Sequence, residues 1–407
     1  MEYVFNFVFL YPFVMAFVWI FGSLVFRVFV KNFLPSVPAV VGTPPVSILV
    51  PCHNEERCIE ETIRRLERQN YPQFEVIAVD DASTDGTALV LRRLQKEFRN
   101  LRVITLKSNQ GKGTGLTMAT LCSRSEYLMC IDADAILDPD AIRWMMWHFQ
   151  SSPRVGAVTG NPKVRNRTSI LSKIQVGEFS SIVGMIKRAQ RVLGRIYTVS
   201  GVVALFRKRA LMDVGFWSNN MVTEDIDISW KLQLGMWEIR YEPRALCWIL
   251  VPETLKGILR QRFRWSQGGN EVLLKYYHCL FAWRHARMWP LYLEYCLSVL
   301  WCYCFLMTAV LWATGLVVDL PPEFRVRTLI PGFTGVIIAV VCIVQLSVGL
   351  LLDSRYDKSL RKLVPWLVWY PAIYWIVNCA VTLLAFPKAL FRPRSKLAVW
   401  ESPDRGL

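Results

Sequence analysis

The chain has 407 residues, of which 53% are hydrophobic, and carries a net charge of +16. Its mean hydropathy is positive, which argues against an ordinary soluble protein of this size. The charge alone would fit a nucleic-acid-binding protein, but no zinc-finger spacing or other nucleic-acid motif is present, and basic loops beside anionic lipid explain it more simply. The eleven cysteines include no CxxC pair, which indicates buried thiols in a reducing compartment.

Long uncharged runs indicate membrane-spanning helices at residues 3–26, 295–318, 329–352 and 363–386. Each run exceeds the roughly 20 residues that a helix needs to cross a hydrocarbon core. The first run follows no basic stretch and precedes no small-residue cleavage site, so we interpret it as a retained anchor and not as a signal peptide. The segment between the first two runs has an ordinary composition and is predicted to form one soluble domain.

Basic residues flank the predicted soluble domain on both sides, at Arg27, Lys31, Arg284, His285 and Arg287. Because basic loops stay in the cytoplasm, the domain is predicted to be cytoplasmic. The tail is also basic, with Lys388, Arg392, Arg394 and Lys396. Four complete spans would nevertheless place both termini outside. Either the tail is tolerated there, or the run 363–386, which contains Pro365 and Pro371, does not cross fully.

The chain is therefore expected to comprise five parts: a membrane helix at 1–30, a cytoplasmic domain at 31–252, interfacial helices at 253–288, three membrane helices at 289–387 and a basic tail at 388–407. Two stretches, 169–194 and 253–274, place basic residues between apolar ones at helical spacing. Each fits a helix that lies on a membrane surface, or an ordinary amphipathic helix packed on a sheet.

Short β-type runs alternate with helical stretches in the first half of the domain, at residues 46–50, 75–79, 102–106 and 127–131. This alternation predicts an α/β domain with a largely parallel sheet and helices on both faces. Polar residues follow the strands directly, at the edge where open α/β sheets bind their ligands. The edge after these strands is therefore the predicted active site.

Acidic and basic side chains at this edge are candidates for binding a nucleotide. Asp132 and Asp134 share one turn and could hold a divalent ion beside a diphosphate, or could form an ordinary turn. Asp81 either contacts a nucleoside or caps the next helix. Lys112 follows a glycine-rich turn that lacks the first glycine of a Walker loop.

Two later motifs are candidates for catalysis. Glu224 and Asp225 begin a predicted helix, where acids are favourable, and Asp225 is also the best remaining candidate for a general base. Gln261, Arg264 and Trp265 recur at i, i+3 and i+4, on one helical face. An arginine fork suits a phosphate and an indole suits a sugar, although the same residues would also serve as an interfacial anchor.

Taken in order, these motifs resemble glycosyltransferase family 2, and specifically the processive membrane synthases of cellulose, hyaluronan and chitin. The resemblance covers the whole cytoplasmic domain. It implies a GT-A-type, Rossmann-like cytoplasmic domain with interfacial amphipathic helices, inserted between transmembrane α-helices. Further residues are similar to the bacterial branch that makes poly-N-acetylglucosamine for biofilms, namely those at 5–7, 11–12, 159–162, 173–178, 199–201, 223–232, 247–248, 252–255 and 400–406.

The sequence departs from the family pattern at four positions. His53 stands where an aromatic ring is usual, and Ala82 replaces a glycine after the aspartate pair. Gly113 and Gly115 stand where alanine is usual in the lysine motif. None of these departures removes a charged catalytic group.

The resemblance implies UDP-N-acetylglucosamine as donor and an inverting displacement that lengthens a β-1,6-linked polysaccharide. The implied roles are nucleotide-sugar binding by His53, Asn54, Glu55, Asp81, Lys112 and Asp132. A divalent ion, Mg²⁺ or Mn²⁺, would be held by Asp132 and Asp134. Asp225, with Glu224, would act as the base, and the acceptor and pyrophosphate end would be formed by Ser200, Gly201, Gln261, Arg264 and Trp265. It also implies a bacterial inner-membrane location, contact with the lipid bilayer and a small membrane accessory subunit.

Three alternatives remain open. The first is a synthase of another polymer, such as hyaluronan, cellulose or a chitin-like chain, although about 20 residues after the last helix leave no room for the cyclic-dinucleotide domain usual in cellulose synthases. The second is a transferase that adds one sugar to a lipid. The third is a membrane channel with a degenerate domain, which the complete set of charged motif residues disfavours.

Overall fold

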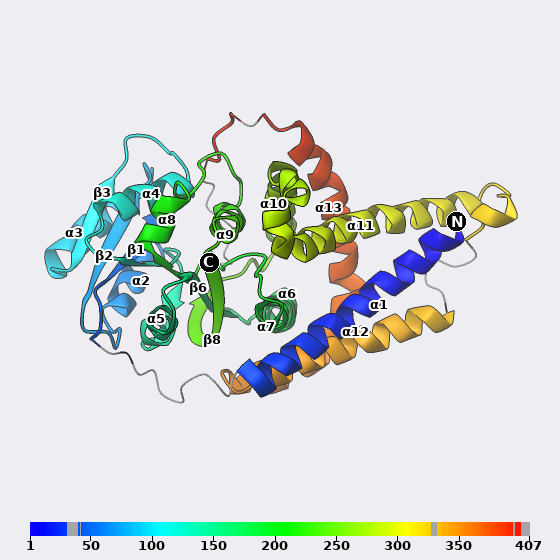
Figure 1. Cartoon of the computed structure of the whole chain (residues 1–407), viewed down its shortest axis with the longest axis horizontal. Helices are drawn as coiled ribbons and strands as arrows, with labels where there is room; N and C mark the ends of the chain where they lie inside the picture. Colours follow the sequence, from blue (N-terminus) through cyan, green and yellow to red (C-terminus); the bar gives the residue numbers. More distant parts are fainter. Residues whose placement is uncertain (31–39, 41, 327–331, 394, 400–407) are drawn as a thin grey trace.

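The structure is a computed structural model that describes residues 1–30, 40, 42–326, 332–393 and 395–399. Most of the proline-rich stretch 35–45, which is predicted to link the first membrane helix to the domain, and the motif 400–406 therefore lie outside the described residues. Figure 1 shows an α/β part on one side, from which the long helices α1, α11 and α12 project on the other side. Helices α6, α7 and α10 lie between the two parts.

The α/β part is built on one eight-stranded sheet with the order β3-β2-β1-β4-β7-β6-β8-β5. The strands are β1 (Val46–Cys52), β2 (Phe74–Asp80), β3 (Leu101–Thr105), β4 (Tyr127–Cys130), β5 (Ile136–Leu137), β6 (Val155–Val164), β7 (Ala204–Arg207) and β8 (Glu238–Ile249). The first four strands are parallel to one another, as predicted. Strand β7 is antiparallel to β4 and β6, so the complete sheet is mixed.

Helices cover both faces of the sheet because the strands alternate the side to which they send apolar residues. In β1, Ile48 and Val50 face one core, which they share with helices α2, α3 and α5, while Leu49 faces a second core with α4, α8 and α9. These helices are α2 (Ile59–Leu66), α3 (Thr87–Glu97), α4 (Lys112–Cys122), α5 (Ala141–Ser151), α8 (Lys208–Asp213) and α9 (Glu224–Leu234). The three-layer arrangement confirms the predicted α/β fold.

Three helices within the described residues are long and apolar enough to cross a membrane: α1 (Glu2–Val25), α11 (Trp289–Gly315) and α12 (Gly332–Asp353). They correspond to the first three predicted runs. The fourth run forms α13 (Trp369–Phe391), whose described apolar part is shorter, Ile376–Phe391. Helix α13 packs along α10 (Leu255–Lys275) and runs across the direction of α11 (Figure 1).

Both ends of the segment that contains α13 contact the α/β part. Before it, Asp353 at the end of α12 forms ion pairs with Lys163 and Arg188. After it, the backbone N–H of Ala398 donates to the carbonyl oxygen of Asn219 over 2.9 Å. The chain between Asp353 and Ala398 therefore leaves the α/β part and returns to the same part.

The predicted amphipathic stretch 169–194 forms one continuous helical segment, made of α6 (Ile170–Glu178), a π-helical turn (Phe179–Met185) and α7 (Ile186–Val192). This segment packs against α1 and α12. The contacts are close: a Cβ atom on Gly349 of α12 would lie 2.6 Å from the Cα of Ser181, and one on Gly22 of α1 would lie 2.7 Å from the Cβ of Ala189. Glycine lets these helices approach so closely.

Candidate active site

A cavity of about 880 Å³ opens beside the ends of β1 and β4. It brings together seven of the residues predicted from the sequence, which come from five separate segments: Glu55, Lys112, Asp132, Asp134, Glu224, Gln261 and Arg264. Strand order explains this convergence, because β1 and β4 are parallel neighbours and their carboxyl ends meet at one edge. Helices α9 and α10 close the cavity from the other side.

Lys112 is the electrostatic centre of the cavity. Its ammonium group lies 2.6 Å from Oδ1 of Asp132 and 3.0 Å from Oε1 of Glu224. Burial alone would lower the pKa of Lys112, but these two carboxylates raise it above its usual value. Burial also raises the pKa of Asp132, although Lys112 opposes that shift. The lysine therefore stays charged and holds two acids from different elements together.

Asp225 is next to this ion cluster but does not line the cavity wall. Burial, and then the charge of Glu224, raise its pKa to about 6. A carboxylate with such a pKa accepts protons better than an ordinary aspartate and is still ionised at neutral pH. A Cβ atom on Gly201 would lie 3.2 Å from Oδ2 of Asp225 and 3.3 Å from the ammonium of Lys112, so the turn at Gly201 contacts both groups.

Asp81 holds the loop that leads to Lys112. Its two carboxylate oxygens accept hydrogen bonds from the backbone N–H groups of Gln110 and Gly111, each over 2.7 Å. His53 lies beside it, with Nδ1 2.8 Å from the carbonyl oxygen of Asp81. Neither side chain lines the cavity, so their predicted contact with uridine stays a prediction.

Asn54 and Glu55 form the turn after β1. Asn54 adopts a positive φ of 56°, and its side-chain oxygen accepts a hydrogen bond from the backbone N–H of Thr84 over 2.8 Å. Glu55 is 1% exposed, lines the cavity and donates its backbone N–H to Thr87 over 2.7 Å. These bonds fix the β1 turn against the loop after β2.

The motif on α10 is divided between two environments. Gln261 and Arg264 line the cavity, and the guanidinium of Arg264 is exposed to it. Trp265 instead packs edge-on against Phe179, and Arg262 lies 4.4 Å from the centre of its ring. The three motif residues therefore do not share one surface, and the tryptophan joins α10 to the helical segment 170–192.

The structure places further residues at the site that sequence reasoning missed. The ammonium of Lys187 lies 2.5 Å from Oγ of Ser200, whose backbone N–H donates to Thr159 over 2.8 Å. Lys187 was visible in the sequence only as one basic residue of an amphipathic stretch. Its position beside Ser200 follows from the packing of α7 against β8 and from its contact with Thr159 of β6, which the helical pattern does not reveal.

The tail forms one wall of the cavity. The cavity-lining residues of this wall are Pro387, Lys388 and Phe391 at the end of α13, and Arg392, Pro393, Lys396, Leu397, Ala398 and Val399 after it. The guanidinium of Arg392 lies 3.2 Å from Oε1 of Glu271 in α10, which holds the tail in place. A Cβ atom on Gly111 would lie 2.0 Å from the carbonyl oxygen of Ala398, so this glycine is needed for the tail to pass.

Of the departures from the family pattern, Ala82 is strained by its backbone conformation, whereas Gly113 has a structural reason. Ala82 adopts a positive φ of 54°, a conformation in which glycine is preferred. A Cβ atom on Gly113 would lie 2.9 Å from the carbonyl oxygen of Ser218, so alanine would not fit there without a shift of the backbone.

Asp132 and Asp134 fit a divalent ion that binds together with a diphosphate. Both line the cavity. Within the residues that the structure describes, no group of three or more histidine, cysteine or acidic side chains is arranged to hold a metal alone. Magnesium usually takes one or two carboxylates and completes its shell with phosphate oxygens and water, and two aspartates on one turn supply that share.

The fold, and a cavity with acidic residues after β4 and at the start of α9, define a glycosyltransferase of the GT-A type. A family model described as "Glycosyltransferase like family 2" matches residues 44–268. A poly-beta-1,6-N-acetyl-D-glucosamine synthase of Staphylococcus epidermidis is 41% identical over 415 aligned residues, 99% of each chain. The synthase of Staphylococcus aureus (strain COL) is 41% identical over 410 residues, 99% of this chain and 98% of its own. The chain belongs to glycosyltransferase family 2 and, within it, to the poly-β-1,6-N-acetyl-D-glucosamine synthases.

Among solved structures, the chain is similar to a mannosyltransferase of Pyrobaculum calidifontis in complex with GDP-Man and Mn²⁺. The TM-score is 0.58 at 20% sequence identity, and the match covers 94% of this chain and 99% of the other. At this identity the similarity confirms the GT-A-type fold.

Proposed function

We propose that the chain polymerises N-acetylglucosamine from UDP-N-acetylglucosamine into a β-1,6-linked polysaccharide for the biofilm matrix. Its full-length relatives, named as synthases of that polymer, support the choice of sugar and linkage. The single observation that carries the proposal is the cluster of Lys112, Asp132 and Glu224 in one cavity, with Asp225 beside it. This cluster supplies both a diphosphate site and a base.

The donor would bind with its diphosphate at the Lys112 side of the cavity. Lys112 and the exposed Arg264 would neutralise the phosphate oxygens, because fixed cations stabilise the charge that develops on the leaving group. Asp132 and Asp134 would hold Mg²⁺ or Mn²⁺, which when bound would neutralise the same oxygens. His53, Asn54, Glu55 and Asp81 would shape the nucleoside end.

Asp225 would act as the general base for the acceptor. It would take the proton from the 6-hydroxyl of the growing chain while that oxygen forms a bond to C1 of the donor sugar. The bond from C1 to the diphosphate oxygen would break, and UDP would leave with its electron pair. Attack opposite to the leaving group inverts C1 and gives the β linkage. Ser200, Gly201, Gln261 and Trp265 would shape the acceptor end.

The active site would face the cytoplasm of a bacterium, with α1, α11 and α12 in the inner membrane. Basic residues near the ends of α1 and α11 support this orientation. Because the segment from Asp353 to Ala398 begins and ends at the α/β part, α13 would lie along the membrane surface and not cross it. A small membrane accessory subunit would assist export of the chain.

The test is to supply isolated membranes with each radiolabelled UDP-sugar and to digest the product with linkage-specific glycosidases. We expect a polymer only from UDP-N-acetylglucosamine, sensitive to a β-1,6-specific enzyme and abolished by EDTA until Mg²⁺ or Mn²⁺ is restored. Incorporation of another sugar would favour a synthase of another polymer, and a single sugar on lipid would favour a lipid transferase. Either outcome would refute the proposal.

A further inference from the structure

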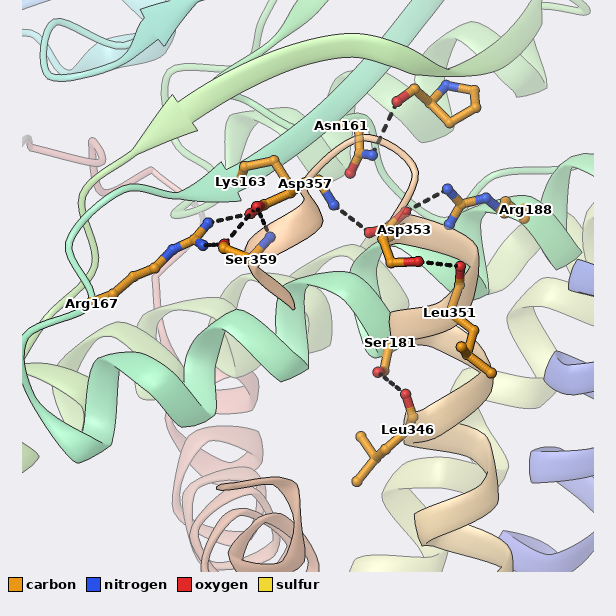
Figure 2. Close-up of polar contacts among 12 residues, drawn as sticks. Asn161, Lys163, Arg167, Ser181, Arg188, Leu346, Leu351, Asp353, Asp357 and Ser359 are labelled. Carbon is orange, nitrogen blue, oxygen red and sulfur yellow. Dashed lines mark hydrogen bonds and ion pairs between the residues drawn. The ribbon is translucent and has the colours of Figure 1, made fainter. Parts of the chain in front are cut away.

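A buried ion cluster joins the end of α12 to the α/β part. The carboxylate of Asp353 is fully buried and accepts hydrogen bonds from Lys163 on β6 and from Arg188 on α7, the latter over 2.5 Å. Figure 2 shows both cations converging on this carboxylate. Lys163 is 2% exposed and Arg188 is 3% exposed. The charges of two buried cations are therefore balanced by one carboxylate, which the apolar helix α12 supplies.

A second buried contact lies one residue along α7. Lys187 precedes Arg188, and its ammonium lies 2.5 Å from Oγ of Ser200 and 3.4 Å from Oγ1 of Thr159. Lys187 is 5% exposed, and burial lowers its pKa to about 7. A lysine so desolvated beside two hydroxyl groups costs stability, which favours a functional reason for its position.

The two contacts are mechanically connected through two elements. Arg188 and Lys187 are neighbours on α7. Lys163 and Thr159 both lie on β6, four residues apart. A shift of α7 or β6 at the Asp353 cluster would therefore be transmitted to Ser200.

Ser200 in turn holds the turn that contacts the proposed base. The next residue, Gly201, has no side chain, and a Cβ there would lie 3.2 Å from Oδ2 of Asp225. The carbonyl oxygen of Gly201 lies 3.4 Å from the ammonium of Lys112. The position of this turn sets the space available for an acceptor hydroxyl next to Asp225.

We propose that Asp353 and Lys187 are positioning residues, through which the end of α12 fixes the Ser200–Gly201 turn beside Asp225. This inference rests on the function proposed above for Asp225. It assigns to α12 a role in the chemical step besides its place among the apolar helices.

The proposal is tested by a double-mutant cycle on the full chain in membranes, with polymer formation from UDP-N-acetylglucosamine as the assay. Asp353→Asn and Lys187→Met should each lower kcat by about tenfold or more, because a small misplacement of reacting groups is costly. The KM for the donor should stay within about twofold, since neither residue contacts the nucleotide. The kcat of the double variant should stay within about twofold of that of the slower single variant, because the effects of coupled residues do not add.

A matched control lies beside the cluster. Asp357 also pairs with a cation of the α/β part, Arg167, over 2.5 Å, but this pair does not involve α7 (Figure 2). Asp357→Asn should keep kcat within about twofold of wild type. If Asp353→Asn does not accumulate, a variant that carries both Asp353→Asn and Lys163→Met is used instead. This variant removes one buried cation together with the anion.

Wild-type kcat in Lys187→Met would overturn the proposal, as would additive losses in the double variant or an equal loss in Asp357→Asn. Direct binding of UDP to each variant shows that the donor site is intact. Failure of the proposed function would look different, because the wild-type chain itself would then make no polymer from UDP-N-acetylglucosamine.

Discussion

The ammonium group of Lys112 lies 3.0 Å from Oε1 of Glu224, and this pair joins the first residue of α4 to the first residue of α9. The two residues are far apart in the sequence, and their helices pack against the same face of the mixed sheet. Their contact lies between the proposed donor site and the proposed base.

Lys112→Met should lower kcat by about a hundredfold or more, because it removes a fixed cation from the site where charge develops on the leaving diphosphate. It should also raise the KM for the donor. Lys107→Met removes an exposed lysine five residues earlier and should leave both constants unchanged. Initial rates of UDP release at several donor concentrations measure both constants. Equal rates in the two variants would contradict the role of Lys112.

Activity should depend on the ionisation of Asp225. Its pKa is raised to about 6, so below this pH the folded protein holds Asp225 protonated and unable to accept a proton. The value of kcat should therefore rise with pH through about 6 and reach a plateau above it. Measurements of kcat from pH 5 to 8, a range that includes this pKa, test the expectation. A kcat that does not change between pH 5 and pH 8 would contradict it.

Asp225→Asn should abolish turnover and leave UDP binding intact, because the amide keeps the size of the side chain but cannot take the proton. Removal of a base costs several kcal/mol of barrier, at least about a hundredfold in rate. Calorimetric titration with UDP, beside a rate measurement, separates the two effects. Loss of both in a normally folded variant would refute the assigned role.

Asp227 holds α9 against α10, so its removal should reduce stability. The carboxylate is fully buried and lies 2.6 Å from the ammonium of Lys275 and 2.8 Å from the hydroxyl of Tyr276. Asp227→Asn should lower the free energy of unfolding by about 2 kcal/mol, the cost of weakening charged hydrogen bonds inside a protein. Asp213→Asn, at an exposed position, should not change it. Thermal melting of the purified variants compares the two.

Ala82→Gly should stabilise the protein by about 0.5–1 kcal/mol, because alanine is strained at a positive φ and glycine is not. Ala119→Gly is the matched control: it lies inside α4 at 1% exposure, where glycine should destabilise by about 1 kcal/mol. Opposite shifts of the melting temperature are expected. Destabilisation by both variants would show that Ala82 is not strained.

The first half of the domain could be predicted from sequence because β1 to β4 are short apolar runs that end in polar residues. Each predicted strand overlaps the observed one to within about two residues. Strands β5 to β8 went unpredicted for identifiable reasons. Strand β6 contains Gly160 and Pro162, which normally argue against a strand, and β5 has two residues.

The site was predictable where chemistry is carried by charged residues after strands, as at Lys112 and Asp132. It was not predictable where a role depends on packing. Helical spacing predicts that Trp265 lies on the same face as Arg264, but in the structure Trp265 packs against Phe179 on another surface. Asp353 looks like the charge that ends an apolar run, and only the approach of β6 and α7 shows that it is buried.

The contacts of Gly22 with Ala189 and of Gly349 with Ser181 leave no space between the helical segment 170–192 and its two apolar neighbours. Helices α1 and α12 are thus packed tightly against this segment and cannot slide along it without steric overlap. Any movement that advances a polymer by one sugar would then involve elements outside this contact, and those that line the cavity are α4, α9, α10, the end of α13 and the tail.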